Sequence, residues 1–283
     1  MRQNAALLPT RSVISVHGPE AEKFLSGLIT NTLNKSPEAT FSGLLTPQGK
    51  ILFDFIVKPE GSSYLIDLPA DLTPDFLKRL MLYKLRADVT IEDKTDAYKV
   101  LAIWGAGACP ENAFTDPRHK DLGFRAIVST SDYEAFINGF NLLTEADYTA
   151  HRILVTIPEG GQDYLYSDAF PHDACYDYIN GVDFKKGCFV GQEVVSRMKH
   201  RGTARKRMVQ VISTETLPET GTDIISDGQT LGRLGSVHDK NAIALVRLDR
   251  VAKAIKNNLP ITISDNPVTL EIPAWADYKF EGR

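Results

Sequence analysis

Strand-like apolar runs alternate with apolar residues at helical spacing in the first half of the chain, and this alternation predicts a mixed α+β fold. Residues 12–16 are a strand-like apolar run. Apolar residues at helical spacing then follow Gly18-Pro19-Glu20, where proline occupies the first helical position. We expect this helix to end near Thr30-Asn31. The other strands expected in this half are residues 41–45, 51–57, 64–68, 89–91, 99–104 and 126–129, and further helices start near residues 73, 132 and 145.

Turn-forming residues join two of these strands and interrupt the pattern further on. Thr46-Pro47-Gln48-Gly49 has proline at the second position and glycine at the fourth, which fits a type I turn and predicts a hairpin over residues 41–57. Residues 105–124 are rich in glycine, alanine, proline and aspartate, so we expect a loop there.

The pattern changes after Arg207, where short apolar runs are divided by Gly, Asp, Asn and Pro. Regular short strands with turn signals between them predict a small antiparallel barrel or sandwich. We therefore place a domain boundary between an α+β region at residues 1–203 and an all-β domain at residues 204–283. The strands expected in the second domain are residues 208–212, 222–225, 231–237, 242–248, 261–263 and 268–272.

The composition is that of an ordinary globular protein, with 43% hydrophobic and 24% charged residues among 283. No run approaches the ~18 uncharged residues of a membrane-spanning helix, and the apolar stretch at residues 5–8 is too short for a signal peptide. Cys109, Cys175 and Cys188 are widely spaced and include no C-x-x-C pair, so we predict neither a disulfide framework nor a zinc ribbon. We expect reduced thiols in a cytoplasmic protein without a membrane partner or a metal site.

Positive charge is concentrated between Phe184 and Arg207. This stretch holds eight cationic residues and one acidic residue, Glu193, in a chain whose net charge is −4. Such focusing suggests an anionic ligand or partner, and a solvated basic helix paired with acidic neighbours explains it equally well. Because no Phe, Tyr or Trp lies between Arg197 and Arg207 to stack on bases, we favour an anionic small molecule or a partner surface over nucleic acid.

The segment at residues 185–193 combines a cysteine with glycines and lysines. Cys188 lies between Gly187 and Gly191, beside two lysines, and helical spacing begins near Gln192. Lysine ammonium groups and a helix N-terminus both stabilise a thiolate, which is the nucleophilic and metal-binding form of cysteine. The alternative is a small buried residue packed beside Phe189.

The neighbours of Cys188 also have two interpretations. Gly187 and Gly191 suit a sharp turn or a close approach of the backbone to a ligand, while Gln192 and Glu193 offer an amide and a carboxylate at the helix start. The alternative is ordinary helix-entry chemistry, in which Glu193 is a favourable first-turn charge.

The same segment carries a family resemblance. Lys186-Gly187-Cys188-Phe189-Val190-Gly191-Gln192-Glu193 resembles the K-G-C-[YF]-x-G-Q-E signature of the YgfZ family of folate-binding proteins, relatives of the glycine cleavage T-protein, an aminomethyltransferase. The resemblance implies a three-lobed GcvT/YgfZ-like α+β fold around a folate-binding cavity, with the C-terminal antiparallel β-barrel as the third lobe. Other segments fall in the family's order, namely residues 28–31, 44–57, 160–163, 170–173, 232–237 and 242–247.

The resemblance further implies tetrahydrofolate as the cofactor and a role in assembling or maintaining iron–sulfur clusters in client enzymes, including some that modify tRNA. The expected partners are folate, whose polyglutamate tail suits the basic stretch, and iron–sulfur client enzymes or assembly proteins. For the chemistry we expect Cys188 with Lys186 and Glu193. The residues expected to bind folate are Asn31, Asp54, Asp163, Gly187, Gly191, Gln192 and Arg197.

Two aspartates are folate candidates because a pterin ring presents adjacent N–H donors, which one carboxylate accepts as a matched pair. Asp54 and Asp163 are the carboxylates we expect in this role, with Asn31 as a neutral partner. Each aspartate has an alternative. Asp163 fits a turn residue after Gly160-Gly161, and Asp54 fits an outward-facing strand position.

A second function is compatible with the resemblance, namely tetrahydrofolate-dependent aminomethyl transfer of the T-protein kind. The T-protein has consecutive aspartates after its G-G turn, whereas this chain has Phe53-Asp54, and Lys50 replaces the second glycine. The T-protein uses an aspartate there to support aminomethyl transfer. We therefore favour the iron–sulfur role and leave enzymatic activity open.

Overall fold

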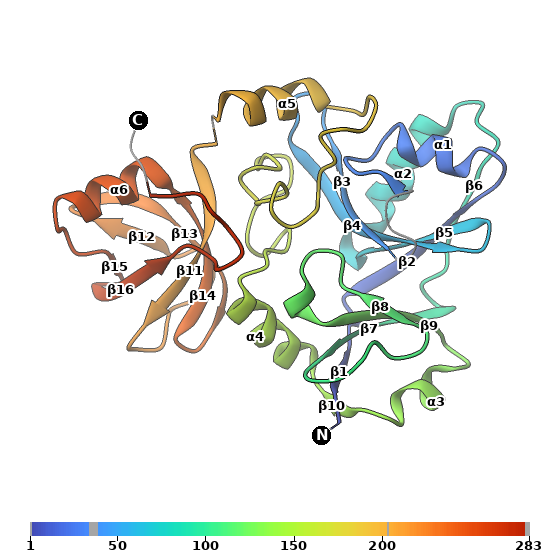
Figure 1. The fold of residues 1–283 in the computed structure, drawn as a ribbon, viewed down its shortest axis with the longest axis horizontal. Coiled ribbons are helices and arrows are strands. Elements are labelled where there is room, and N and C mark those ends of the chain that lie inside the picture. Colours follow the sequence, from blue (N-terminus) through green and yellow to red (C-terminus); the bar gives the residue numbers. More distant parts are fainter. Residues whose placement is uncertain (1, 34–38, 203, 281–283) are drawn as a thin grey trace. The chain divides into compact units, whose positions relative to one another are not determined.

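The computed structural model describes residues 2–33, 39–202 and 204–280, which form two units (Figure 1). The chain leaves the first unit and returns to it twice. The first unit comprises Met1–Pro47, Leu52–Tyr148 and Asn180–Gln192, and the second comprises Gln48–Ile51, Thr149–Ile179 and Glu193–Arg283.

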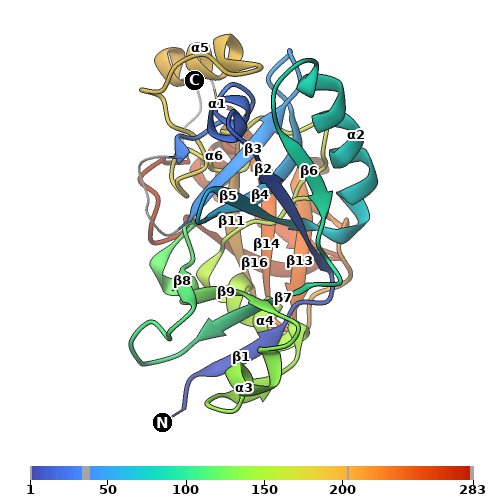
Figure 2. The same ribbon diagram turned by 90° about the vertical axis from the view of Figure 1, so that its right-hand side faces the viewer.

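The first sheet of the first unit has five strands, and the helices α1 and α2 pack with it in one apolar core. Its strand order is β3-β4-β5-β2-β6. Leu25 of α1 (Ala21–Ser26) and Phe76 and Leu80 of α2 (Thr73–Lys84) pack in one core with apolar side chains of β2, β4 and β5. Figure 2 shows α2 running alongside this sheet. The strands are β2 (Arg11–His17), β3 (Thr40–Leu45), β4 (Ile51–Glu60), β5 (Ser63–Pro69) and β6 (Thr90–Asp93), and the short helix η2 (Ala70–Leu72) precedes α2.

The second sheet of this unit has the order β10-β1-β7-β9-β8. Aromatic residues of α3 (Tyr133–Ile137) pack on its small apolar core, which includes Leu101 and Ile103. β1 runs parallel to β10, and the other neighbouring strands are antiparallel. The elements are β1 (Asn4–Leu7), β7 (Tyr98–Trp104), β8 (Ala113–Thr115), η3 (Lys120–Leu122), β9 (Phe124–Ser129) and β10 (Asn141–Leu143).

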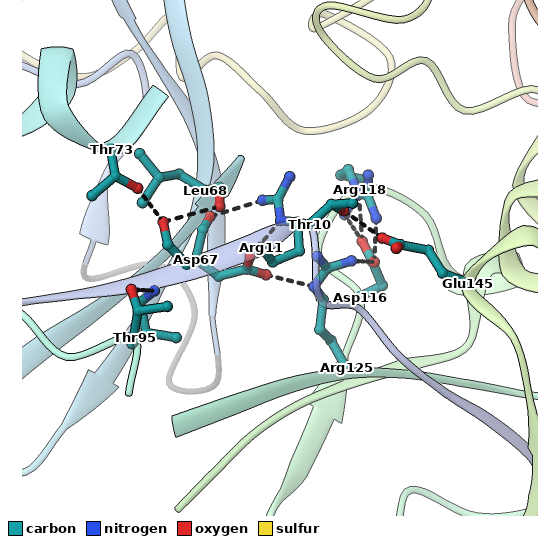
Figure 3. A network of polar contacts seen from close by, with 12 residues as sticks. Thr10, Arg11, Asp67, Leu68, Thr73, Thr95, Asp116, Arg118, Arg125 and Glu145 are labelled. Carbon is teal, nitrogen blue, oxygen red and sulfur yellow. Dashed lines mark hydrogen bonds and ion pairs between the residues drawn. The ribbon is translucent and has the colours of Figure 1, made fainter. Parts of the chain in front are cut away.

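A buried ion-pair network joins the two sheets of the first unit (Figure 3). Asp67 of β5 accepts hydrogen bonds at 2.6 Å from Arg11 Nε and at 2.6 Å from Arg125 Nε of β9. Arg118 donates to both oxygens of Asp116, at 3.0 and 2.7 Å. Burial alone would raise the pKa of Asp67, but the adjacent guanidinium groups outweigh burial and lower this pKa. The network therefore requires an ionised Asp67.

The second unit contains a closed six-stranded barrel with the order β11-β14-β13-β12-β15-β16, and β16 pairs with β11 to complete it. α6 (Leu248–Lys256) buries Val251 and Ala254 on the barrel core. Two further helices are α4 (Glu145–Val155), which runs from the first unit into the second, and α5 (Gln192–Arg201). The strands are β11 (Lys206–Ser213), β12 (Asp223–Ser226), β13 (Gln229–His238), β14 (Asn241–Arg247), β15 (Thr262–Ile263) and β16 (Asn266–Glu271).

The structure corrects three predicted elements. The first helix ends at Ser26, four residues before Thr30, because Gly27 follows as its C-cap and the chain then bridges to β3 through Ile29 and Leu44. Residues 105–124 are only partly a loop, since β8 and η3 lie there. α6 was not predicted, because its first turn continues the apolar run of β14. The boundary at residues 203 and 204 stays a prediction, since Thr203 lies outside the described residues.

Candidate functional site

Cys188 lies in an irregular segment, residues 183–191, which we call the thiol loop. The loop belongs to the first unit and ends where α5 begins at Gln192. The Cys188 side chain is exposed, whereas Phe189 beside it is only 8% exposed and Val190 packs against the core of the first sheet. The alternative of a buried structural cysteine is therefore wrong for Cys188, and the loop is anchored directly after the thiol.

Lys186 anchors the thiol loop on the other side of Cys188. Its Nζ atom donates to three backbone oxygens, of Ser26 at 2.9 Å, Ile29 at 2.6 Å and Asn31 at 2.9 Å. An ammonium group has three N–H donors, so these carbonyls use all of them. Burial lowers the pKa of Lys186 to about 8, against a smaller raising effect of Asp183. The amine that we expected beside the thiol thus holds the end of α1.

Asp183 and Asn31 fix the base of the thiol loop. Asp183 is buried and accepts from Thr32 Oγ1 at 2.6 Å and from the Lys185 backbone N–H at 2.9 Å. The Asn31 amide donates to the carbonyls of Phe41 at 3.0 Å and Asn180 at 2.6 Å. Asp183 was missed by sequence reasoning, because no local signal pairs it with Thr32, 151 residues earlier. Asn31 organises the backbone through the same groups that we expected to contact folate.

Backbone geometry requires glycine at one of the two glycine positions of the thiol loop, and packing does not require it at the other. Gly191 has φ of 80°, in the left-handed region that favours glycine, so the loop geometry itself requires it. A Cβ atom added at Gly187 would meet no atom within 4 Å. Packing therefore gives no reason for glycine at position 187, and the missing side chain leaves open space next to an exposed thiol.

The remaining predicted residues are spread over both units. Gln192 contacts the thiol loop by donating from Nε2 to the Lys186 carbonyl at 3.5 Å. Glu193 and Arg197 are exposed residues of α5 that the contact pattern groups with the second unit. Asp54 is 5% exposed in β4, so the alternative of an outward-facing strand position is wrong for it.

Asp163 lies in a buried polar cluster of the second unit. Its Oδ2 accepts from Arg152 Nη1 at 2.6 Å and from the Glu159 N–H at 2.8 Å, and its Oδ1 accepts from the Ser236 N–H at 2.7 Å. Both carboxylate oxygens are thus used inside the unit. Its role in folate binding stays a prediction, and the contacts favour a structural role.

A cavity of about 540 Å³ in the first unit borders the anchors of the thiol loop. Asn31, Thr32 and Asp183 line one side, and residues around Asp116 and Lys120 line the other. The volume falls in the range of ~300–1,000 Å³ that is typical of small-molecule sites. Two carboxylates, two amides, a histidine and a lysine give this cavity a polar lining of mixed charge.

The basic stretch contributes to a second cavity, of about 750 Å³, within the second unit. Arg207 is not available to a ligand there, because it pairs with Asp177 through two hydrogen bonds of 2.6 and 2.9 Å and its guanidinium lies over the rings of Tyr178 and Tyr278. Burial, aided by Arg207 and Lys199, lowers the pKa of His172 to about 4. The cations that line this cavity besides Arg207 are Lys199, Arg205 and Lys279.

Cys175 differs from Cys188 because it is buried, whereas Cys109 is exposed like Cys188. Burial raises the pKa of Cys175 to about 11, so this thiol is protonated at neutral pH. In the described ranges, no group of three or more His, Cys, Asp or Glu side chains is arranged to hold a metal ion. Among the same residues, no helix is long and apolar enough to cross a membrane.

Replacing Lys186 with methionine is expected to lower the free energy of unfolding by about 1–3 kcal/mol, because three backbone carbonyls lose their donor. The neighbouring exposed residue gives a matched control, Lys185→Met, which we expect to change stability by less than about 0.5 kcal/mol. Denaturant unfolding measures both variants. Equal stability of the two would show that Lys186 does not anchor the loop.

Comparison with solved structures settles the fold. The chain superimposes on the glycine cleavage system aminomethyltransferase T from Bartonella henselae with a TM-score of 0.76, covering 98% of this chain and 87% of that one at 14% sequence identity. The predicted GcvT-like α+β fold with a C-terminal antiparallel barrel is thereby confirmed. Residues 205–278 also match the family model of the CAF17 C-terminal beta-barrel domain.

Comparison of sequences identifies the family. The human iron–sulfur cluster assembly factor IBA57, named as mitochondrial, is 30% identical over an alignment of 307 positions, which covers 95% of this chain and 84% of the human protein. This chain belongs to the IBA57 family. The IBA57 homologue of Neurospora crassa is 33% identical over 237 residues, and the alignment spans 75% of this chain but only about half, 54%, of that protein.

Membership of the IBA57 family corrects two expectations. The YgfZ family is a related family, and the named relatives of this chain carry the IBA57 name instead. The predicted cytoplasmic location is wrong, because these relatives are named mitochondrial. Reduced cysteines indicate a reducing compartment, and they do not distinguish the cytosol from another one.

Proposed function

We propose that this chain is an iron–sulfur cluster assembly factor that presents Cys188 as a cluster ligand. The observation that supports this role is an exposed thiol on a loop that Lys186 and Phe189 anchor on both sides. Open space at Gly187 lets a bulky inorganic group or a partner approach the sulfur. By likeness to its named relatives, we place this role in mitochondria.

A partner must complete the coordination. Iron–sulfur clusters are commonly held by four protein ligands, chiefly thiolates. Since the described part of the chain offers no group of three ligands, the other ligands come from a second protein or a small thiol. Cys188 then forms one iron–sulfur bond while one bond from iron to a donor thiolate breaks, and the proton of the Cys188 thiol passes to the departing thiolate. This ligand exchange requires no oxidant or reductant.

Anaerobic native mass spectrometry tests the ligand role. The chain is incubated with a preformed glutathione-ligated iron–sulfur cluster, and we expect an adduct that contains the cluster and glutathione. The Cys188→Ser variant is expected to lose this adduct, and Cys109→Ser, which removes the other exposed thiol, is expected to keep it. An adduct that persists in Cys188→Ser would exclude Cys188 as the ligand.

We further propose that the cavity of the first unit binds a reduced folate. We also propose that the enzymes whose iron–sulfur clusters depend on this chain include tRNA-modifying ones. Support for folate comes from the cavity's volume and from its polar lining of mixed charge. Lys120 at the same cavity suits the glutamate end of the ligand. The likeness to aminomethyltransferase T concerns the fold alone, so it adds no support for aminomethyl transfer.

Calorimetric titration with tetrahydrofolate tests the folate proposal. We expect saturable heat with the intact chain and about 2–5-fold weaker binding in Lys120→Ala, as one exposed charge contact is lost. Lys253→Ala on the barrel helix α6 is the matched control. Absence of heat, or equal affinity of all three proteins, would count against a folate site at this cavity.

A further inference from the structure

The C-terminal end of α2 exposes an unusual concentration of apolar side chains. Met81, Leu82 and Leu85 are 55%, 65% and 87% exposed. Eight large apolar side chains are exposed in the described part of the chain, and three of them therefore lie within five residues. Scattered exposed leucines need no explanation, but a contiguous group of this kind marks an interaction site.

Cations surround these three side chains. Lys78, Arg79, Lys84 and Arg86 give the segment a charge of +4, and residues 76–87 contain no acidic residue. Within the described residues, none of the four cations makes an ion pair or a side-chain hydrogen bond. The protein as a whole has a net charge of −4, so this positive surface is local. We call the seven side chains the α2 surface.

Leu85 occupies a backbone conformation that its residue type disfavours. It follows α2 directly, with φ of 45° and ψ of −107°, where a glycine is the usual residue. A leucine that is both in this region and 87% exposed contributes nothing visible to the core. Disfavoured backbone conformations are concentrated at functional sites.

A hollow of about 400 Å³ lies beside Leu85. It is lined by Phe24 and Lys23 of α1, by Glu20, and by the chain from Tyr83 to Ala87. Phe24 and Tyr83 are partly buried and pack against the core of the first sheet, so this core holds two aromatic side chains of the lining in place. Such a hollow accepts one apolar side chain of a partner, in the way that interface anchors fill pockets.

We propose that the α2 surface is a docking site for an acidic protein surface that presents one apolar anchor residue. Charge complementarity selects this occupant, because four unpaired cations attract an acidic face and steer its approach. A symmetric dimer would place two +4 surfaces opposite each other, which is repulsive. A bilayer is flat, whereas the hollow beside Leu85 is concave.

Photo-crosslinking in cells tests the proposal on the full chain. A benzoyl-phenylalanine at position 85 is expected to capture a protein through an acidic segment, and the same group at exposed Leu142 is the control position. Adducts with lipid, adducts with a second copy of this chain, or no adduct above the Leu142 control would each overturn the proposal. The capture is expected to survive Cys188→Ser, so this inference fails separately from the proposed function.

The captured protein is then purified and titrated with variants of the α2 surface. Leu85→Ser is expected to weaken binding by about 10-fold through loss of a buried apolar contact. Lys84→Glu with Arg86→Glu is expected to weaken it further at low salt and to reduce its salt dependence. Leu85→Gly separates docking from folding, because it is expected to raise the thermal unfolding midpoint while still weakening binding. Unchanged affinity in Leu85→Gly and Leu85→Ser would overturn the proposal even if capture succeeded.

Discussion

Cells in which Cys188 is replaced by serine are expected to lose the activity of dependent iron–sulfur enzymes down to the level of a deletion. The protein itself is expected to remain folded, because the side chain is exposed and a surface substitution changes stability by less than about 0.5 kcal/mol. Enzyme assays in extracts and thermal unfolding of the purified variant measure the two effects separately.

Cys109→Ser is the matched control for this experiment, because Cys109 is also exposed and lies outside the thiol loop. Activity is expected to survive in that variant. Full enzyme activity in Cys188→Ser cells would remove the ligand role from the thiol loop, and loss of activity with loss of folding would point to a structural cysteine instead.

Replacing Asp67 with asparagine is expected to cost about 3–5 kcal/mol of unfolding free energy, since it leaves Arg11 and Arg125 as buried guanidinium groups without their shared carboxylate. The two sheets of the first unit are joined at this point, so β5 and β9 are expected to lose protection together in hydrogen exchange. Asp71→Asn, an exposed position in η2, is the control and is expected to be nearly neutral. Protection lost in only one sheet would contradict a joint role.

Acid stability follows from the same network. The pKa values of Asp67 and Asp116 are lowered, in both cases because neighbouring arginines outweigh the raising effect of burial. A lowered pKa in the folded state contributes stability that is present above the unfolded value near 3.8 and is lost as pH falls through the folded value. The first unit is therefore expected to stay folded through pH 4 and to unfold below it. In Asp67→Asn, the unfolding free energy is expected to depend less on pH in this acid range.

Local signals were enough to predict most strands and the barrel. Sequence neighbours alone determine the turn at Thr46-Pro47-Gln48-Gly49, and the structure has a hairpin of β3 and β4 there. The same holds for the short strands after Arg207, which form a closed barrel. The short strands β1 and β10 were not predicted, because a run of three or four residues carries too little periodicity.

Candidate residues were harder to predict than elements, because their partners are distant in sequence. The signature around Cys188 identified the thiol, but no pattern indicates that Lys186 donates to the end of α1 or that Thr32 pairs with Asp183. A carboxylate suited to a pterin looks the same in sequence as one that neutralises a buried arginine. Asp163 shows the difference only through its contacts with Arg152 and Ser236.

The anchoring of the thiol loop also sets when this protein can become active during its synthesis. Lys186 closes onto the Ser26 carbonyl across 160 residues, and the chain between them crosses into the second unit and back. At roughly 5–20 residues per second, the carbonyls wait on the order of ten seconds for their donor. A truncated or stalled chain that ends before residue 183 can therefore contain every strand from β1 to β10 and yet lack Cys188.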